Sequence, residues 1–249
     1  VPRREQTRNF NYLAFRKATR PLMRQRCMVG RYSFSQASHS SKLRGEMAKT
    51  LFFDIETAPN LSYVWGQWQQ DVIEHVDEWY ILCFSYKWED HKTTHVVALK
   101  DFELYDNDPG NDLQVVKKLW ELLDEADIVI GHNSDAFDIK KANARFVYHG
   151  LGPPSHYQTV DTLKMARRHF KFNSNRLGHL GEHLGLGGKE ATGGFETWAG
   201  CMNGDAKAWS VMKKYAKQDV DLLVDVYERL RPWATNHPNR NVIDETSHA

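Results

Sequence analysis

Two carboxylates at the end of an apolar run are the first residues in this chain that suit metal chemistry. Asp54 and Glu56 close the stretch "TLFFDIET", residues 50–57. Because alternate residues of a strand share one face, their side chains are expected to be neighbours. Two like charges so close repel each other unless a cation compensates them, and hard divalent ions such as Mg²⁺ prefer oxygen ligands of this kind. The pair alone is a weak indication, because an exposed strand carries the same spacing.

Two later stretches add further candidates. In "GHNSDAFDIKK" a polar loop follows a short apolar run, and Asp138 falls in the first turn of an expected helix. A helix N-terminus favours a carboxylate without any metal, and Asp135 also reads as an ordinary helix cap. In "YAKQD", Tyr215 and Asp219 are four residues apart and therefore share one helix face. The alternative interpretation of Asp219 is that it belongs to an acidic helix face exposed to solvent and binds no metal.

Apolar periodicity predicts a mixed α/β protein. Strands are expected at residues 49–56, 79–88, 94–100 and 127–133, with a shorter one opening 156–170. Helices are expected at 111–126, 136–150, the later part of 156–170, and 205–230, whereas the Gly-rich segment 185–205 is expected to be a loop. Asp161 or Thr162 is expected to cap the helix in 156–170. Strands first and βα units afterwards predict a mixed central sheet flanked by helices, with its ligand beyond the strand ends.

Taken in order, the three stretches resemble the exonuclease motifs of a known family. "FDIET", then N-x-x-x-F-D, then Y-x-x-x-D are similar to the motifs of the DEDD (DnaQ-like) 3′–5′ exonucleases, in their tyrosine subclass, DEDDy. The likeness is greatest to the proofreading domain of family B DNA polymerases and to stand-alone phage and bacterial relatives, and it covers about residues 49–231. The histidine subclass has a His five residues before the last Asp, where this chain has Lys214.

This resemblance implies an RNase H-like fold and hydrolysis of nucleic acid from its 3′ end to 5′-mononucleotides. It implies that two divalent ions, Mg²⁺ or Mn²⁺, are bound by Asp54, Glu56, Asp138 and Asp219. Asp54 would bridge the ions, and Asp138 would hold the second one. Tyr215 would orient the attacking water. Contacts to the nucleic acid are expected from three further residues, Thr57, Asn133 and Phe137.

The substrate and partners are open at this stage. DNA with single-stranded or frayed 3′ ends is the expected substrate, in replication or repair, with a partner from those processes and without a membrane. The motifs do not separate DNA from RNA, because that distinction depends on contacts to the 2′-hydroxyl. The alternatives are therefore an exoribonuclease, and a catalytically silent or partner-dependent nucleic-acid-binding module. Two basic segments, 140–145 and 164–176, are candidates for contacts to phosphates, and a solvated helix face is the other interpretation of each.

Charge divides the chain of 249 residues near Met47. Residues 1–46 hold 11 Lys or Arg and 2 acids, a net charge of +9, so the remaining 22 basic and 30 acidic residues give −8. We expect 1–46 to be a disordered basic leader, 47–232 an exonuclease domain, and 233–249 a flexible tail. Three interpretations of the leader are open: a phosphate-binding arm, a transit peptide, or a segment outside the natural protein. The third has support in the tetrapeptide "RGEM", residues 44–47, because the codons for it can form a ribosome-binding site followed by a start codon. Translation would then begin at Met47.

Cysteine usage and hydropathy bear on the compartment. Three widely spaced cysteines form neither a metal-binding pair nor a disulfide framework, which favours a reducing compartment. No apolar run approaches the roughly 18 residues that cross a bilayer. We expect a cytoplasmic protein, encoded by a bacterium or a phage, or a mitochondrial one if the leader is a transit peptide.

Overall fold

The computed structural model describes residues 48–68, 71–188 and 193–238, which belong to one compact unit. The predictions of a disordered leader at 1–46 and of a flexible tail from residue 239 onward lie outside the described residues. Within the described ranges, no helix is both long enough and apolar enough to cross a lipid bilayer.

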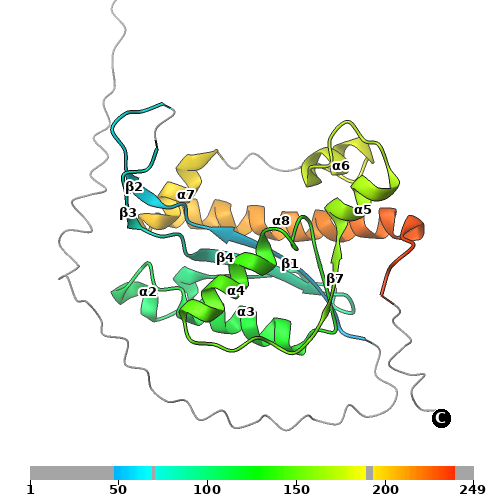
Figure 1. Ribbon diagram of the computed structural model, residues 1–249, viewed down its shortest axis with the longest axis horizontal. Helices are drawn as coiled ribbons and strands as arrows, with labels where there is room; N and C mark the ends of the chain where they lie inside the picture. The colour runs from blue at the N-terminus through cyan, green and yellow to red at the C-terminus, as the bar shows by residue number, and fades with distance from the viewer. Residues whose placement is uncertain (1–47, 69–70, 189–192, 239–249) are drawn as a thin grey trace, which may run out of the picture. The chain divides into compact units, whose positions relative to one another are not determined.

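A five-stranded mixed sheet forms the centre of the domain (Figure 1). Its strand order is β5-β4-β1-β6-β7, built from β5 His95–Ala98, β4 Ile81–Trp88, β1 Thr50–Thr57, β6 Ile128–Gly131 and β7 Gln158–Asp161. Strand β4 is antiparallel to both of its neighbours, β5 and β1, whereas β6 pairs in parallel with β1, and β7 pairs in parallel with β6. This arrangement confirms the predicted mixed sheet with its antiparallel strands first.

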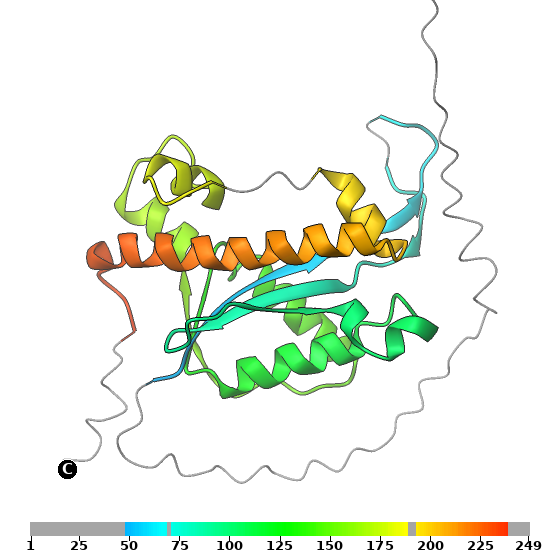
Figure 2. The same cartoon turned by 180° about the vertical axis from the view of Figure 1, so that it is seen from behind.

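Helices cover both faces of the sheet. The long helix α8, Ala206–Leu230, crosses one face beside β1 and β4, while α3, Leu113–Glu125, and α4, Asp138–Tyr148, lie on the other (Figures 1 and 2). The smaller helices are α2 Leu104–Asn107, α5 Thr162–His169, α6 Leu177–His183 and α7 Phe195–Met202, with 3₁₀ turns η1 Leu99–Asp101 and η2 Arg231–Trp233. A separate ribbon pairs β2, Leu61–Tyr63, with β3, Glu74–Asp77.

Side chains of β1 alternate between the two faces and so aim the carboxylates at α8. One set belongs to the core cluster that contains residues of α3 and α4, namely Leu51, Phe53 and Ile55. Phe52 points the other way and packs edge-on against Tyr227 of α8, with ring centroids 5.3 Å apart. Asp54 and Glu56 follow Phe52 with the strand period of two. They therefore continue the face that α8 covers.

Small side chains let α8 approach the sheet where the acidic residues lie. Ser85 of β4, paired in register with Asp54, donates a hydrogen bond from its hydroxyl to the carbonyl oxygen of Ala216, 2.7 Å away. Both residues are fully buried. Because Ala216 lies between Tyr215 and Asp219 on the helix, this contact fixes the depth at which both of them enter the site.

The prediction of a loop throughout 185–205 is wrong over part of that segment. Helix α7 forms there, after Gly194 at a φ of 71°. It packs on α8 at Gly200, where an added Cβ would lie 2.5 Å from the Cβ of Ala208. The close approach that glycine allows compensates its poor helix propensity, so tertiary packing decides the structure. Helix α6 and the β2–β3 ribbon were also absent from the sequence prediction.

Candidate metal centre

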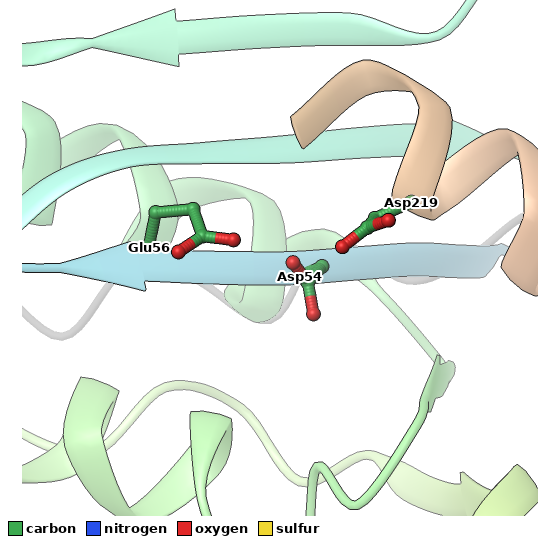
Figure 3. A group of neighbouring side chains, drawn as sticks. All are labelled: Asp54, Glu56 and Asp219. Atoms are coloured by element: carbon green, nitrogen blue, oxygen red, sulfur yellow. The ribbon is translucent and has the colours of Figure 1, made fainter. Parts of the chain in front are cut away.

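Three of the four predicted carboxylates converge at the junction of β1 and α8. One oxygen each of Asp54, Glu56 and Asp219 lies within 4.8 Å of the others (Figure 3). Asp219 is buried and the other two are half-buried. The donor set contains only carboxylate oxygens, which suits a hard divalent cation such as Mg²⁺ or Mn²⁺. Three negative charges this close repel one another, so a bound cation would stabilise their ionised forms.

The fourth predicted carboxylate, Asp138, lies beside this group and has a different attachment. It is the first residue of α4, and its Oδ1 accepts a hydrogen bond from the backbone N–H of Ile55 at 3.0 Å. Its oxygens are not part of the 4.8 Å group. Burial raises the pKa of Asp138 to about 7, against the lowering effect of the bonds from the amides of Ile55 and of Asp138 itself, and the charge of Asp161 adds to the rise.

Tyr215 precedes Asp219 by one turn of α8, and a hydrogen bond joins the two side chains. Burial is the main reason that the pKa of the phenol is raised, and the charges of Asp219 and Glu56 raise it further. The hydroxyl therefore stays protonated and acts as a hydrogen-bond donor. Its ring meets Trp198 of α7 edge-on, with centroids 6.0 Å apart. The phenol is held in place from both ends.

The loop after β6 is fixed by Asp161, which sequence analysis predicted only as a helix cap. Its carboxylate does cap α5, accepting from the N–H of Leu163 at 2.9 Å. The same oxygen accepts from the N–H of Asn133, also at 2.9 Å, and this holds Asn133 in a left-handed conformation at a φ of 66°. His132, one residue earlier, is in hydrogen-bond contact with the Thr162 hydroxyl at 2.9 Å. Asp161 thus positions the loop as well as the helix.

The three predicted nucleic-acid contacts differ in their placement. Asn133 lines a cavity that also includes Asp54. Thr57 is half-buried at the end of β1. Phe137 is 41% exposed immediately before α4, with the Lys141 ammonium 5.5 Å from its ring centroid. Phe137 thus exposes part of its ring to solvent, and Asn133 lies closer to the acidic group because it shares a cavity with Asp54.

Comparison with known proteins identifies the family. The model of a family described as the RNase_H superfamily matches residues 51–231, which is most of the chain. The chain belongs to the RNase_H superfamily. The predicted RNase H-like fold is thereby confirmed, because the matched residues contain α8 and all of the central sheet except its first residue, Thr50.

A solved structure has a similar fold. The family B DNA polymerase from the hyperthermophilic archaeon Pyrobaculum calidifontis is similar, with a TM-score of 0.55 and 16% identity over 75% of this chain. The match covers 25% of the polymerase, so this chain corresponds to about a quarter of that protein's length. At this identity the likeness concerns the fold alone. No curated protein matches the chain.

Proposed function

We propose that this RNase_H superfamily member is a metal-dependent nuclease, specifically a 3′–5′ exonuclease of the DEDDy type. The observation that carries the proposal is the convergence of Asp54, Glu56 and Asp219 within 4.8 Å, with Tyr215 hydrogen-bonded to Asp219. The 3′–5′ polarity of degradation is inferred from the three ordered sequence motifs and the family that they resemble. The proposed substrate is DNA with a single-stranded or frayed 3′ end, used in replication or repair.

The chain's own residues define the roles in this reaction. Asp54, Glu56 and Asp219 would hold one divalent ion, and Asp138 would contribute to a second. When bound, such ions stabilise the charge that develops on the phosphate and lower the pKa of the attacking water. The Tyr215 O–H is donated to Asp219, and the phenol oxygen accepts a hydrogen bond from that water and so orients it toward the phosphorus. Water adds to phosphorus, the bond to the 3′ oxygen breaks, and that oxygen takes a proton. The products are a 5′-mononucleotide and a strand one nucleotide shorter.

A gel assay tests this proposal. Single-stranded DNA and RNA of one sequence, each labelled at the 5′ end, are incubated with the protein and Mg²⁺ or Mn²⁺. The expected result is a ladder that shortens one nucleotide at a time and is faster on DNA. EDTA and Asp219→Asn abolish it, whereas Asp225→Asn, an exposed acid on the same helix, leaves it unchanged.

Each other result removes part of the proposal. Immediate release of a labelled mononucleotide would indicate the opposite polarity. Internal cuts would indicate an endonuclease. Equal loss in Asp219→Asn and Asp225→Asn would mean that the acidic group is not the catalytic centre.

A further inference from the structure

The β2–β3 ribbon, residues 61–68 and 71–77, carries much of the exposed apolar surface of the described chain. More than half of the large apolar side chains that are exposed in the described residues lie between residues 63 and 76. Trp65 is 88% exposed and Trp68 is 77% exposed. The ribbon lies at the end of the domain opposite α6 (Figures 1 and 2). Apolar side chains gathered in this way on a surface mark an interaction site.

The base of the ribbon is fastened to the domain. The N–H of Ala58 donates to the carbonyl oxygen of Tyr80 at 2.9 Å, and the N–H of Trp79 donates to Asn60 Oδ1 at 2.9 Å. The Lys141 ammonium of α4 lies 3.5 Å from the centroid of the Trp79 ring. Among the described strands, β2 and β3 pair only with each other. The domain therefore holds the ribbon in place while its outer surface stays accessible.

Charge decides which class of partner this surface suits. Residues 50–86 contain no Lys or Arg, although the chain from residue 47 onward has 22 of them. The exposed carboxylates of Asp71, Glu74 and Glu78 lie among the apolar side chains instead. Aromatic side chains that stack on the bases of a single strand belong to positively charged grooves, and this surface repels phosphate. A basic partner is therefore favoured over nucleic acid.

Both kinds of side chain on the ribbon suit arginine and lysine. The face of a tryptophan ring attracts a guanidinium or ammonium group, and the apolar stem of the same residue packs on the ring. Carboxylates accept charge-assisted hydrogen bonds from the same groups. Exposed apolar residues such as Val72 and Ile73 would be covered by apolar side chains of the partner. Tyrosine and tryptophan are also among the residues that dominate the binding energy of protein interfaces.

We propose that the β2–β3 ribbon is the docking site for a partner protein, through a segment in which arginine or lysine residues stand beside apolar ones. The proposal does not depend on the nuclease activity. Leu61 follows Glu56 by five residues, a reach of at most about 18 Å in an extended chain. The partner would therefore sit next to the acidic group. A second copy of this chain and a single strand of nucleic acid are the other occupants that the test separates.

Short labelled peptides of equal length serve as the probe for this chemistry. One alternates leucine with arginine, one serine with arginine, and one leucine with glutamate. Fluorescence anisotropy measures their affinity for the full chain in Mg²⁺. The leucine–arginine peptide is expected to bind at least about tenfold more tightly than the other two, because it alone offers both cations and apolar surface.

Variants with matched controls locate the binding. Trp65→Ala should weaken the leucine–arginine peptide about tenfold or more, as for the loss of an interface hot spot. Glu74→Gln should weaken it less and reduce its dependence on salt, because one exposed charge is removed. The control for Trp65 is Trp233→Ala, since Trp233 is 55% exposed but lies in η2, outside the ribbon. The control for Glu74 is Asp225→Asn on α8. Both controls should keep the affinity of the wild type.

The remaining outcomes overturn the proposal in distinguishable ways. Equal affinity for the three peptides, or full affinity in Trp65→Ala, means that the ribbon does not bind this chemistry. Loss of the peptide in Asp219→Asn but not in Trp65→Ala places it at the acidic group. A single-stranded oligonucleotide that loses affinity in Trp65→Ala would assign the ribbon to nucleic acid. A dimer in light scattering that Trp65→Ala dissociates would assign it to a second copy. None of these measurements needs cleavage, so they are valid whether or not the chain is a nuclease.

Discussion

The Asp138 carboxylate accepts a hydrogen bond from the backbone N–H of Ile55, the residue between Asp54 and Glu56. Strand β6 ends at Gly131, and its paired residues on β1 extend only to Phe52, so this amide lies past the paired part of the strand edge. A side chain from α4 takes the place of a neighbouring strand. The same group that the motif assigns to metal binding therefore also ties α4 to β1.

Substitution of Asp138 separates these two roles. Asp138→Asn keeps an oxygen that can accept from Ile55, whereas Asp138→Ala leaves the buried amide unpaired, at a cost of about 1–3 kcal/mol of unfolding free energy. We expect both variants to lose about 100-fold or more of the nuclease rate, because even groups that only support a metal ligand are worth 10- to 100-fold. Urea denaturation should find only the Ala variant destabilised. Full activity in Asp138→Asn would rule out a role for its charge.

Tyr215→Phe removes one hydroxyl and retains the ring that meets Trp198. We expect the turnover rate to fall about 100-fold, the lower end of the range for groups that assist proton transfer or position the reacting water. The affinity for Mn²⁺ should stay unchanged, because the three carboxylates are intact. Single-turnover kinetics and a Mn²⁺ titration measure the two quantities. A variant that loses metal affinity and rate together would assign the hydroxyl to the ordering of Asp219 alone.

Divalent cations should stabilise the folded chain, independently of any substrate. At a free metal concentration of about 100 times Kd, binding to the native state adds about 2.7 kcal/mol. For a domain of this size that corresponds to a rise in Tm of about 5–10 °C. Differential scanning fluorimetry with Mn²⁺ and with EDTA measures the rise. Asp54→Asn should remove it, and Asp225→Asn should retain it. An equal rise in both variants would place the metal elsewhere.

The sequence predicted those parts of the site that depend on local periodicity. Asp54 and Glu56 share a strand face, and Tyr215 and Asp219 share a helix face, because spacings of two and four residues fix these relations within one element. The position of Asp138 at the start of α4 followed from the loop and helix signals around it. That β1, α4 and α8 bring these residues together at one site was implied by the family resemblance and not by the spacing.

Contacts between distant elements could not be predicted in this way. The bond from Asn133 to Asp161 joins residues 28 positions apart and exists because β6 and β7 pair in register. The place of Asn175 and His179 in one cavity depends on how α6 packs beside α5, and sequence analysis had predicted no α6. Helix α7 likewise depends on its contact with α8. Such features need the tertiary structure, because no local signal encodes the partner.

A buried ion-pair network on the α3–α4 side provides a test of stability and of its pH dependence. Asp112 is fully buried and accepts hydrogen bonds from the Arg145 guanidinium, from His149 Nε2 at 2.7 Å and from the Ile81 amide at 2.9 Å. Burial alone would raise the pKa of Asp112, but the bonds from His149, Arg145 and Ile81 outweigh it, so the pKa is lowered below its ordinary 3.8. The ionised form is the one that the fold favours.

Asp112→Ala should lower the free energy of unfolding by about 3–5 kcal/mol at pH 7, because it leaves the Arg145 guanidinium buried without its partner. Since the pKa of Asp112 is lower in the folded state, its stabilisation is complete above the unfolded value of 3.8 and is lost as the pH falls through the folded value. Urea titrations of the wild type and the variant should therefore give a constant difference at pH 5–7 and a shrinking one below pH 3.8. Asp106→Ala, an exposed acid on α2, is the control and should change little. A difference that stays the same at pH 3 would show that Asp112 stabilises the fold without its charge.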